Sequence, residues 1–288
     1  MLTNVFLPPP RDRPGVVVNQ FLFCEVQFKL TLMSVCYSIE TLEFPDPAFK
    51  NIACYLITMA DSPRREQYME ELRKHRPAPL VHIVNNTGFK RCDKGNGVTT
   101  TAHDLWHANL YIMSQVASDA QPVLILEDDV QFTDEFRKRA REVEEFIHDD
   151  STIHAYNLGC CPMLSVPYGN HVRSFLTGDA HAVVYTPSGR AKLEGFKVHY
   201  LHDLETSVHL KTFTSQRPLA VQRKTHTDNS RTWNLYGFPL WYYSLFENEY
   251  SYYETHHALG RCGGQYGAPI MAALVPLIML KAWSTVKK

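Results

Sequence analysis

The segment Val123-Leu124-Ile125-Leu126 constrains the fold of this chain more than any other. Four consecutive apolar residues cannot alternate between a buried and an exposed face, so they are typical of a strand buried on both faces of a parallel sheet. Such a strand needs helices on both sides of its sheet. The run continues directly into Glu127-Asp128-Asp129. The sequence therefore predicts three adjacent carboxylates at the end of a buried strand.

Strand and helix signals alternate before this run. Residues 52–57 and 80–84 have the apolar character of short strands. Between them, Ser62 and Pro63 predict the N-cap and first residue of a helix that ends at His75. These three elements predict one βαβ unit.

Two longer helices are predicted beyond residue 98. Thr99-Thr100-Thr101 predicts the cap region of the first, and Thr133 predicts the cap of the second, whose apolar residues recur at spacings of four and three. The remaining signals are two short strands and a short helix, at residues 154–158, 181–185 and after Pro187. The whole alternation predicts an α/β domain with a mostly parallel central sheet flanked by helices.

The chain is predicted to have three parts. Residues 1–48 form an N-terminal extension, residues 49–232 the α/β domain, and residues 233–288 an aromatic-rich C-terminal segment with an apolar tail. The uncharged part of that tail, Ala268–Leu280, is shorter than the ~20 residues that span a bilayer. It has three interpretations: an interfacial anchor that gives peripheral membrane contact, a partner-binding tail or a docked terminal helix.

Composition excludes several classes of protein. The chain has 288 residues, a net charge of −1 and 44 % hydrophobic residues, so it can bury a large core and has no charge excess for nucleic acid. Its seven cysteines lack zinc-site spacing. The adjacent Cys160 and Cys161 are not expected to pair with each other, and the five dispersed ones are interpreted as reduced, mostly packed thiols: Cys24, Cys36, Cys54, Cys92 and Cys262. Because the N-terminus also lacks a signal-peptide pattern, a cytoplasmic location is predicted.

The three adjacent carboxylates need an explanation, because like charges repel unless a cation compensates them. A divalent metal ion is one explanation, since hard cations take oxygen ligands and ligands bind beyond the carboxyl ends of strands in α/β sheets. A solvated acidic turn that leads into the next helix is the other.

The run Leu124–Val130 resembles the LEDDV signature of glycosyltransferase family 25, the lipopolysaccharide and collagen galactosyltransferase type, where it serves as the DxD motif of a GT-A fold. Other segments resemble the family in the same order, and the similarity spans roughly residues 51 to 230. These segments are Tyr55–Ile57 with Arg64 and Arg65, Gly95–Gly97 with His103 and Trp106, and Gly178–Leu193. The chain departs from the family pattern at Thr58–Ser62 and at Thr101-Ala102.

The resemblance implies a GT-A-like, Rossmann-type domain that moves a sugar, galactose or glucose, from a UDP-sugar donor. The acceptor is a glycan, protein or lipid, and the transfer inverts the anomeric carbon. It also implies Mn²⁺ or Mg²⁺ between Asp129 and the diphosphate, with Glu127 as a further ligand, because a cation offsets charge on the leaving nucleotide. Implied nucleotide contacts come from Glu127, Asp128, Arg64, Arg65, Gly97 and His103.

Three later residues are candidates for the remaining roles. By resemblance, His226 is a further metal ligand, and Asp203 is the general base, with Asp179 as a second candidate base. Asp203 has an alternative interpretation as a helix N-cap.

Two competing hypotheses complete the predictions. Departures from the family pattern favour a catalytically degenerate domain that binds nucleotides or glycans, or acts as a scaffold, and the acidic cluster alone also fits a metal-dependent phosphohydrolase. The aromatic tract from Trp233 to Tyr253 fits sugar stacking, core packing or the interface of a homo-oligomer.

Overall fold

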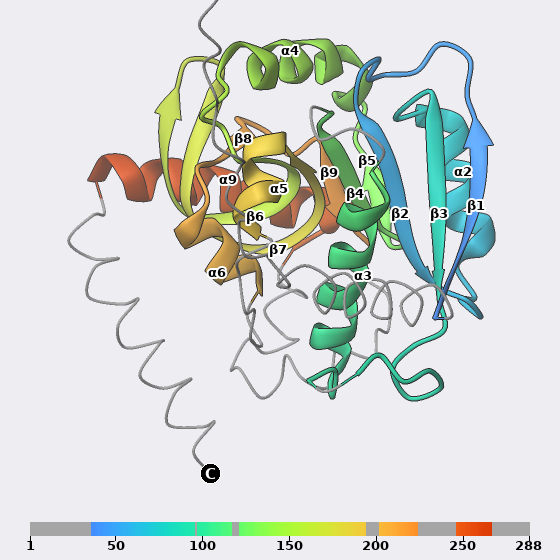
Figure 1. The fold of residues 1–288 in the computed structure, drawn as a ribbon. Coiled ribbons are helices and arrows are strands. Elements are labelled where there is room, and N and C mark those ends of the chain that lie inside the picture. The colour runs from blue at the N-terminus through green and yellow to red at the C-terminus, as the bar shows by residue number, and fades with distance from the viewer. Residues whose placement is uncertain (1–35, 96, 117–120, 194–201, 224–245, 267–288) are drawn as a thin grey trace, which may run out of the picture.

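The computed structural model describes residues 36–95, 97–116, 121–193, 202–223 and 246–266 (Figure 1). Its helices are α2 (Arg65–His75), α3 (Thr101–Gln115), α4 (Phe136–Asp149), α5 (Pro187–Leu193), α6 (His202–His209) and α9 (Glu249–Tyr266). Its strands are β1 (Tyr37–Glu43), β2 (Ala53–Met59), β3 (Leu80–Asn86), β4 (Val123–Glu127), β5 (Val130–Phe132), β6 (Ala155–Tyr168), β7 (His171–Tyr185), β8 (Thr212–Ser215) and β9 (Ala220–Gln222).

Seven strands of the described ranges form one mixed sheet in the order β1-β3-β2-β4-β7-β6-β8. β3, β2 and β4 are parallel, as are β6 and β8. β1 pairs antiparallel with β3, and β7 runs antiparallel to both β4 and β6. The predicted α/β class, with a central sheet flanked by helices, is confirmed. The apolar run at 123–126 forms the third parallel strand, at the centre of the sheet.

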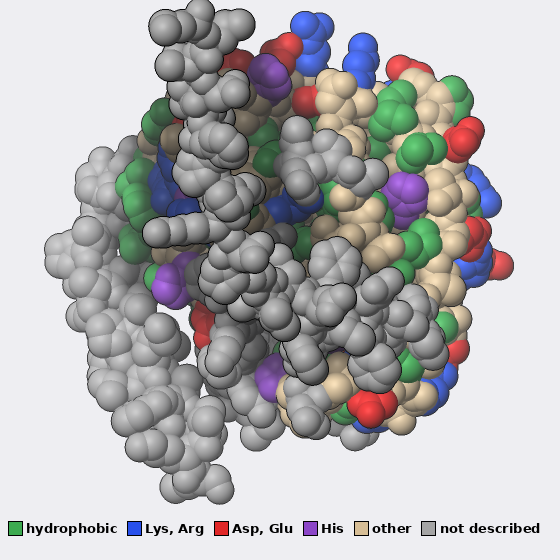
Figure 2. All heavy atoms as spheres, in the orientation of Figure 1, with side chains coloured by type: hydrophobic (Ala, Val, Ile, Leu, Met, Phe, Trp, Pro, Cys, Tyr) green, Lys and Arg blue, Asp and Glu red, His purple; other side chains and the backbone are tan. Residues whose placement is uncertain are grey.

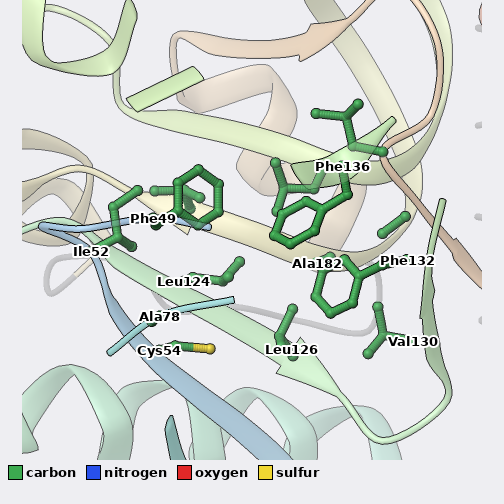
Figure 3. Packing of buried hydrophobic residues seen from close by; sticks show 14 of the residues in the cluster. Phe49, Ile52, Cys54, Ala78, Leu124, Leu126, Val130, Phe132, Phe136 and Ala182 are labelled. Atoms are coloured by element: carbon green, nitrogen blue, oxygen red, sulfur yellow. The ribbon is translucent and has the colours of Figure 1, made fainter. Parts of the chain in front are cut away.

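The two faces of β4 pack against different helices, which explains its unbroken apolar run. Leu124 and Leu126 share one core with apolar residues of α2 and α4, while Val123 and Ile125 share another with residues of α3. Figure 3 shows part of the first core, where Phe132 and Phe136 lie near Leu126 and Ala182. In the described part of the chain, the sheet is therefore covered by helices on both faces.

The segment 37–43, which the sequence assigned to the N-terminal extension, forms edge strand β1 of the central sheet. Just before it, Cys36 forms a disulfide with Cys92 in the loop between β3 and α3. The prediction that these two cysteines are reduced thiols is therefore wrong, because sequence spacing could not show that β1 returns to β3. Cys54 is free and buried, as predicted, and Cys160 and Cys161, which were not expected to pair with each other, are free and buried as well. Disulfides are typical of oxidising compartments, so the cysteines no longer support a reducing one.

We expect replacement of both Cys36 and Cys92 by serine to lower the free energy of unfolding by about 2–4 kcal/mol, because the bridge closes a long loop in the unfolded chain. Urea unfolding with and without dithiothreitol measures this. The reductant should destabilise the wild type and leave the double variant unchanged. Equal stability of the wild type under both conditions would contradict the bridge.

Helix starts were predicted less well than helix positions. Thr100 caps α3 as expected, with its hydroxyl accepting from the His103 amide. Ser62 and Thr133 do not cap α2 and α4, which begin at Arg65 and Phe136. The Thr133 hydroxyl instead donates to the carbonyl of Pro218, and the Ser62 hydroxyl donates to the carboxylate of Asp128. Both hydroxyls have tertiary partners that local sequence does not reveal.

The chain after residue 150 is more regular than its sequence suggests. The strands predicted at 154–158 and 181–185 are the far ends of β6 and β7, which continue into one long hairpin. The short helix after Pro187 is confirmed as α5. From the predicted C-terminal segment, α9 packs against β6. The tail 268–280 lies outside the described residues.

The outer surface carries both signs of charge. Figure 2 shows acidic and basic side chains along the edge of the molecule over α4, where Arg141 pairs with Glu145 one helical turn away. Within the described part of the chain, every helix is too short or too polar to cross a bilayer.

Candidate active site at the carboxyl end of β4

The three parallel strands β2, β3 and β4 end at the same edge of the sheet, after Met59, Asn86 and Glu127. The crevice beyond the carboxyl ends of parallel strands is where α/β proteins bind ligands. The acidic motif therefore lies where a ligand would meet it. Its three carboxylates separate at this point and enter different surroundings.

Asp128 lies on the β2 side and accepts from three donors. Arg64 Nη1 donates to its Oδ1 at 2.6 Å, and the hydroxyls of Thr58 and Ser62 donate to its Oδ2 at 2.8 and 2.7 Å. The same guanidinium lies 3.6 Å from Asp129 Oδ2. Two carboxylates thus share one cation, which offsets part of the repulsion between them.

Asp129 is the most deeply buried member, with 2 % of its surface exposed. Its Oδ2 accepts from Gln222 Nε2 at 2.9 Å, and its backbone carbonyl accepts from the amide of Arg223 at 2.9 Å. Its Oδ1 is buried and has no hydrogen-bond partner among the described residues. Burial raises the pKa of Asp129 to about 6, and Asp128 adds to the rise. A buried carboxylate oxygen without a hydrogen-bond donor destabilises the folded protein unless a ligand contacts that oxygen.

Glu127 faces the opposite side of the sheet from Asp128. It lines a small cavity with Asn109 of α3 and with His181 and Tyr185 of β7. Burial raises its pKa well above the usual value, and the nearby carboxylates, Asp129 first and then Asp203 and Asp179, raise it further. Glu127 is therefore held in an acidic environment in which protonation is favoured.

Asp179 and Asp203, the predicted base candidates, lie beside this second face. Asp179 has a left-handed backbone with φ of 57°, and its Oδ2 accepts from the Tyr253 hydroxyl at 2.5 Å. Asp203 Oδ2 accepts from the amide of Ala180 at 3.1 Å. Asp203 is the second residue of α6, so it is not the N-cap of that helix. Residues far apart in sequence thus bring three carboxylates together: Glu127, Asp179 and Asp203.

The other predicted nucleotide contacts come from other elements. Arg65, unlike Arg64, points to the surface and pairs with Glu40 at 2.6 Å. Gly97, with φ of 113°, belongs to the loop before α3, and His103 lies in the first turn of that helix. The predicted metal ligand His226 lies outside the described residues. The structure thus brings Arg64 to the acidic motif and separates Arg65 from it.

Sequence reasoning missed Gln222 and Tyr253 as partners of the carboxylates, and Thr58 and Ser62 as well. The last two were visible as a departure from the family pattern, and they donate to Asp128. Gln222 gave no signal, because it reaches Asp129 only through the pairing of β9 with β5.

The donor set fits a hard divalent cation that takes one ligand from the protein. In the described ranges, no three His, Cys, Asp or Glu side chains form a metal-binding group. The unpartnered Oδ1 of Asp129 supplies one oxygen, and phosphate oxygens and water complete such sites in nucleotide-binding enzymes. Glu127 faces away from Asp128, so the three carboxylates do not converge as a single ligand set.

Comparison with family models and with curated proteins found no match. Among solved structures, the chain is similar to a protein from Bacillus anthracis assigned as a glucose-1-phosphate thymidylyltransferase and solved in complex with sucrose. The identity is 11 % and the TM-score 0.32, with 63 % of this chain and 74 % of that one covered. A similarity at this level establishes neither a shared family nor a shared activity.

Proposed function

We propose that the protein is a metal-dependent glycosyltransferase of the GT-A type that transfers a hexose from a UDP-sugar to a glycan, protein or lipid acceptor. The single observation that carries this proposal is the buried, unpartnered Oδ1 of Asp129 at the carboxyl end of a central parallel strand. This observation supports the proposal, because hard cations take oxygen ligands and α/β proteins bind ligands beyond the carboxyl ends of their strands. The resemblance of the LEDDV run to family 25 supports the same assignment.

In this proposal, Asp129 holds Mn²⁺ or Mg²⁺, which supplies positive charge to the diphosphate leaving group. Arg64 holds Asp128 in place, and in this proposal its guanidinium, which lies close to both carboxylates, also contacts a phosphate. The hydroxyls of Thr58 and Ser62 fix the second oxygen of Asp128. Asp128 can then accept from a ribose hydroxyl only in the orientation that these donors allow.

The acceptor hydroxyl needs a base on the face of the sheet where Glu127 lies. Asp203 and Asp179 are the candidates, and both are held by donors from other elements. Asp203 Oδ2 accepts from a backbone amide, a contact that fixes the orientation in which this carboxylate would meet a hydroxyl proton. Asp179 bonds the Tyr253 hydroxyl, which fixes its orientation.

A donor screen tests the proposal directly. We expect slow, Mn²⁺-dependent release of UDP from UDP-galactose or UDP-glucose, with no release from GDP- or CMP-sugars and none in the presence of EDTA. Asp203→Asn should lower transfer to an acceptor by about 10²–10⁴-fold, the usual contribution of a general base, while UDP binding persists. Turnover that continues at the same rate in EDTA would exclude the metal-dependent mechanism.

One observation favours a second function, a degenerate domain that binds nucleotide without transfer. Arg64 already places a cation beside both Asp128 and Asp129. If that guanidinium replaces the metal, calorimetry will show UDP binding that is unchanged by Mn²⁺ or EDTA. Tighter binding of UDP with Mn²⁺ would favour the enzyme instead.

A further inference from the structure

Gln222 lies at the end of β9 and contacts the one carboxylate that the proposed function needs most. Its Nε2 donates to Asp129 Oδ2 at 2.9 Å. The other oxygen of that carboxylate is the buried one without a partner. A single amide donor thus decides which of the two oxygens is engaged by the protein and which is left for a ligand.

The backbone around Gln222 is anchored at three points. β9 pairs antiparallel with β5, with Gln222 opposite Val130, and the amide of Arg223 donates to the carbonyl of Asp129. The Arg223 side chain bonds Glu71 Oε1 at 2.7 Å, and Glu71 Oε2 accepts from the amide of Phe132. α2, β5 and β9 are thereby joined around the acidic turn, so the backbone that carries Gln222 is fixed relative to Asp129.

We propose that Gln222 is a positioning residue for the metal ligand, one that holds the Asp129 carboxylate with its Oδ1 toward the cation and diphosphate. This inference rests on the proposed function, since it assigns Asp129 to a metal. Partners that orient a ligating carboxylate change metal affinity by about 10–100-fold when removed. Without the Gln222 donor, the carboxylate can rotate about its Cβ–Cγ bond toward Arg64.

The test compares UDP affinity with saturating Mn²⁺ and with EDTA, measured by calorimetry on the full chain. The ratio of the two affinities isolates the contribution of the metal, because a damaged nucleotide site would lower both. Gln222→Met removes the donor with little change in volume. Gln222→Asn keeps an amide but shortens its reach. Gln131→Met is the matched control, since Gln131 lies on the partner strand β5 opposite Val221.

We expect both Gln222 variants to lower the ratio at least about tenfold while UDP affinity in EDTA stays within about twofold. Gln131→Met should leave both values unchanged. A wild-type ratio in either folded Gln222 variant would overturn the positioning role, even if Asp129→Asn abolishes the Mn²⁺ effect. Loss of the thermal unfolding transition in both variants would also overturn it, because Gln222 would then be required for folding. A wild type whose UDP affinity ignores Mn²⁺ would instead remove the proposed function itself.

Discussion

Asp129→Asn should abolish metal-dependent sugar transfer, lowering the rate by at least about 100-fold, while it makes the metal-free protein more stable at pH 7.5. The activity is lost because an amide is a poor ligand for a hard cation. The stability rises because the buried carboxylate is held with a raised pKa, about 6 in place of 3.8. A residue that serves catalysis at the expense of stability is expected to show this combination of lost activity and increased stability when it is replaced.

The direction of the pH effect follows from the raised pKa. Between about pH 4 and pH 6 the folded protein holds a proton that the unfolded chain has lost, so wild-type stability falls as pH rises through this window. Asp129→Asn has no carboxylate that titrates at this position. Its free energy of unfolding should therefore exceed that of the wild type by up to about 3 kcal/mol above pH 7 and equal it below pH 4. Urea unfolding across this range measures it. Asp149→Asn, at an exposed carboxylate, is the matched control and should change neither quantity. A destabilised Asp129→Asn protein at pH 7.5 would contradict this account.

Arg64→Met should destabilise the protein by about 3 kcal/mol at pH 7.5, because it leaves two largely buried carboxylates without their cation. The cost should shrink at pH 5, where protonation of Asp129 relieves part of the repulsion. Urea unfolding at the two pH values measures both quantities.

The neighbouring arginine provides the control. Arg65 has 51 % of its side chain exposed and pairs with Glu40, itself 41 % exposed, so Arg65→Met should cost less than about 1 kcal/mol. Equal costs for the two variants would mean that the acidic motif does not depend on Arg64 for its stability. The pair of variants thus separates two adjacent residues that sequence alone could not rank.

Much of the α/β framework could be predicted because its signals are local. The apolar run 123–126 and the helix that ends at His75 depend on neighbours within a few residues, and both were placed correctly. The long hairpin of β6 and β7 was recognised only at its ends. Gly159 and Gly178 interrupt the apolar pattern, and a side chain at Gly159 would collide with His181. Such glycines are required by tertiary contacts. A pattern of apolar periodicity instead interprets them as the ends of strands.

The candidate site was predicted in part for a related reason. Carboxylates at a strand end are visible in sequence, and the resemblance located Asp179 and Asp203, which do lie near Glu127. The groups that hold these carboxylates are not visible, because Gln222 and Tyr253 come from elements whose pairing is set by the whole fold. The roles of all these residues stay predictions until the variants are measured.

The distance along the chain between Asp129 and Gln222, 93 positions, has a consequence for synthesis. During translation, a nascent chain that has emerged only as far as α4 already contains the whole LEDDV run and its arginine. It lacks the strand that pairs with β5, so Asp129 would be without its Gln222 donor on the growing polypeptide. Any activity should therefore begin only after β9 has left the ribosome, which a series of stalled chains would reveal.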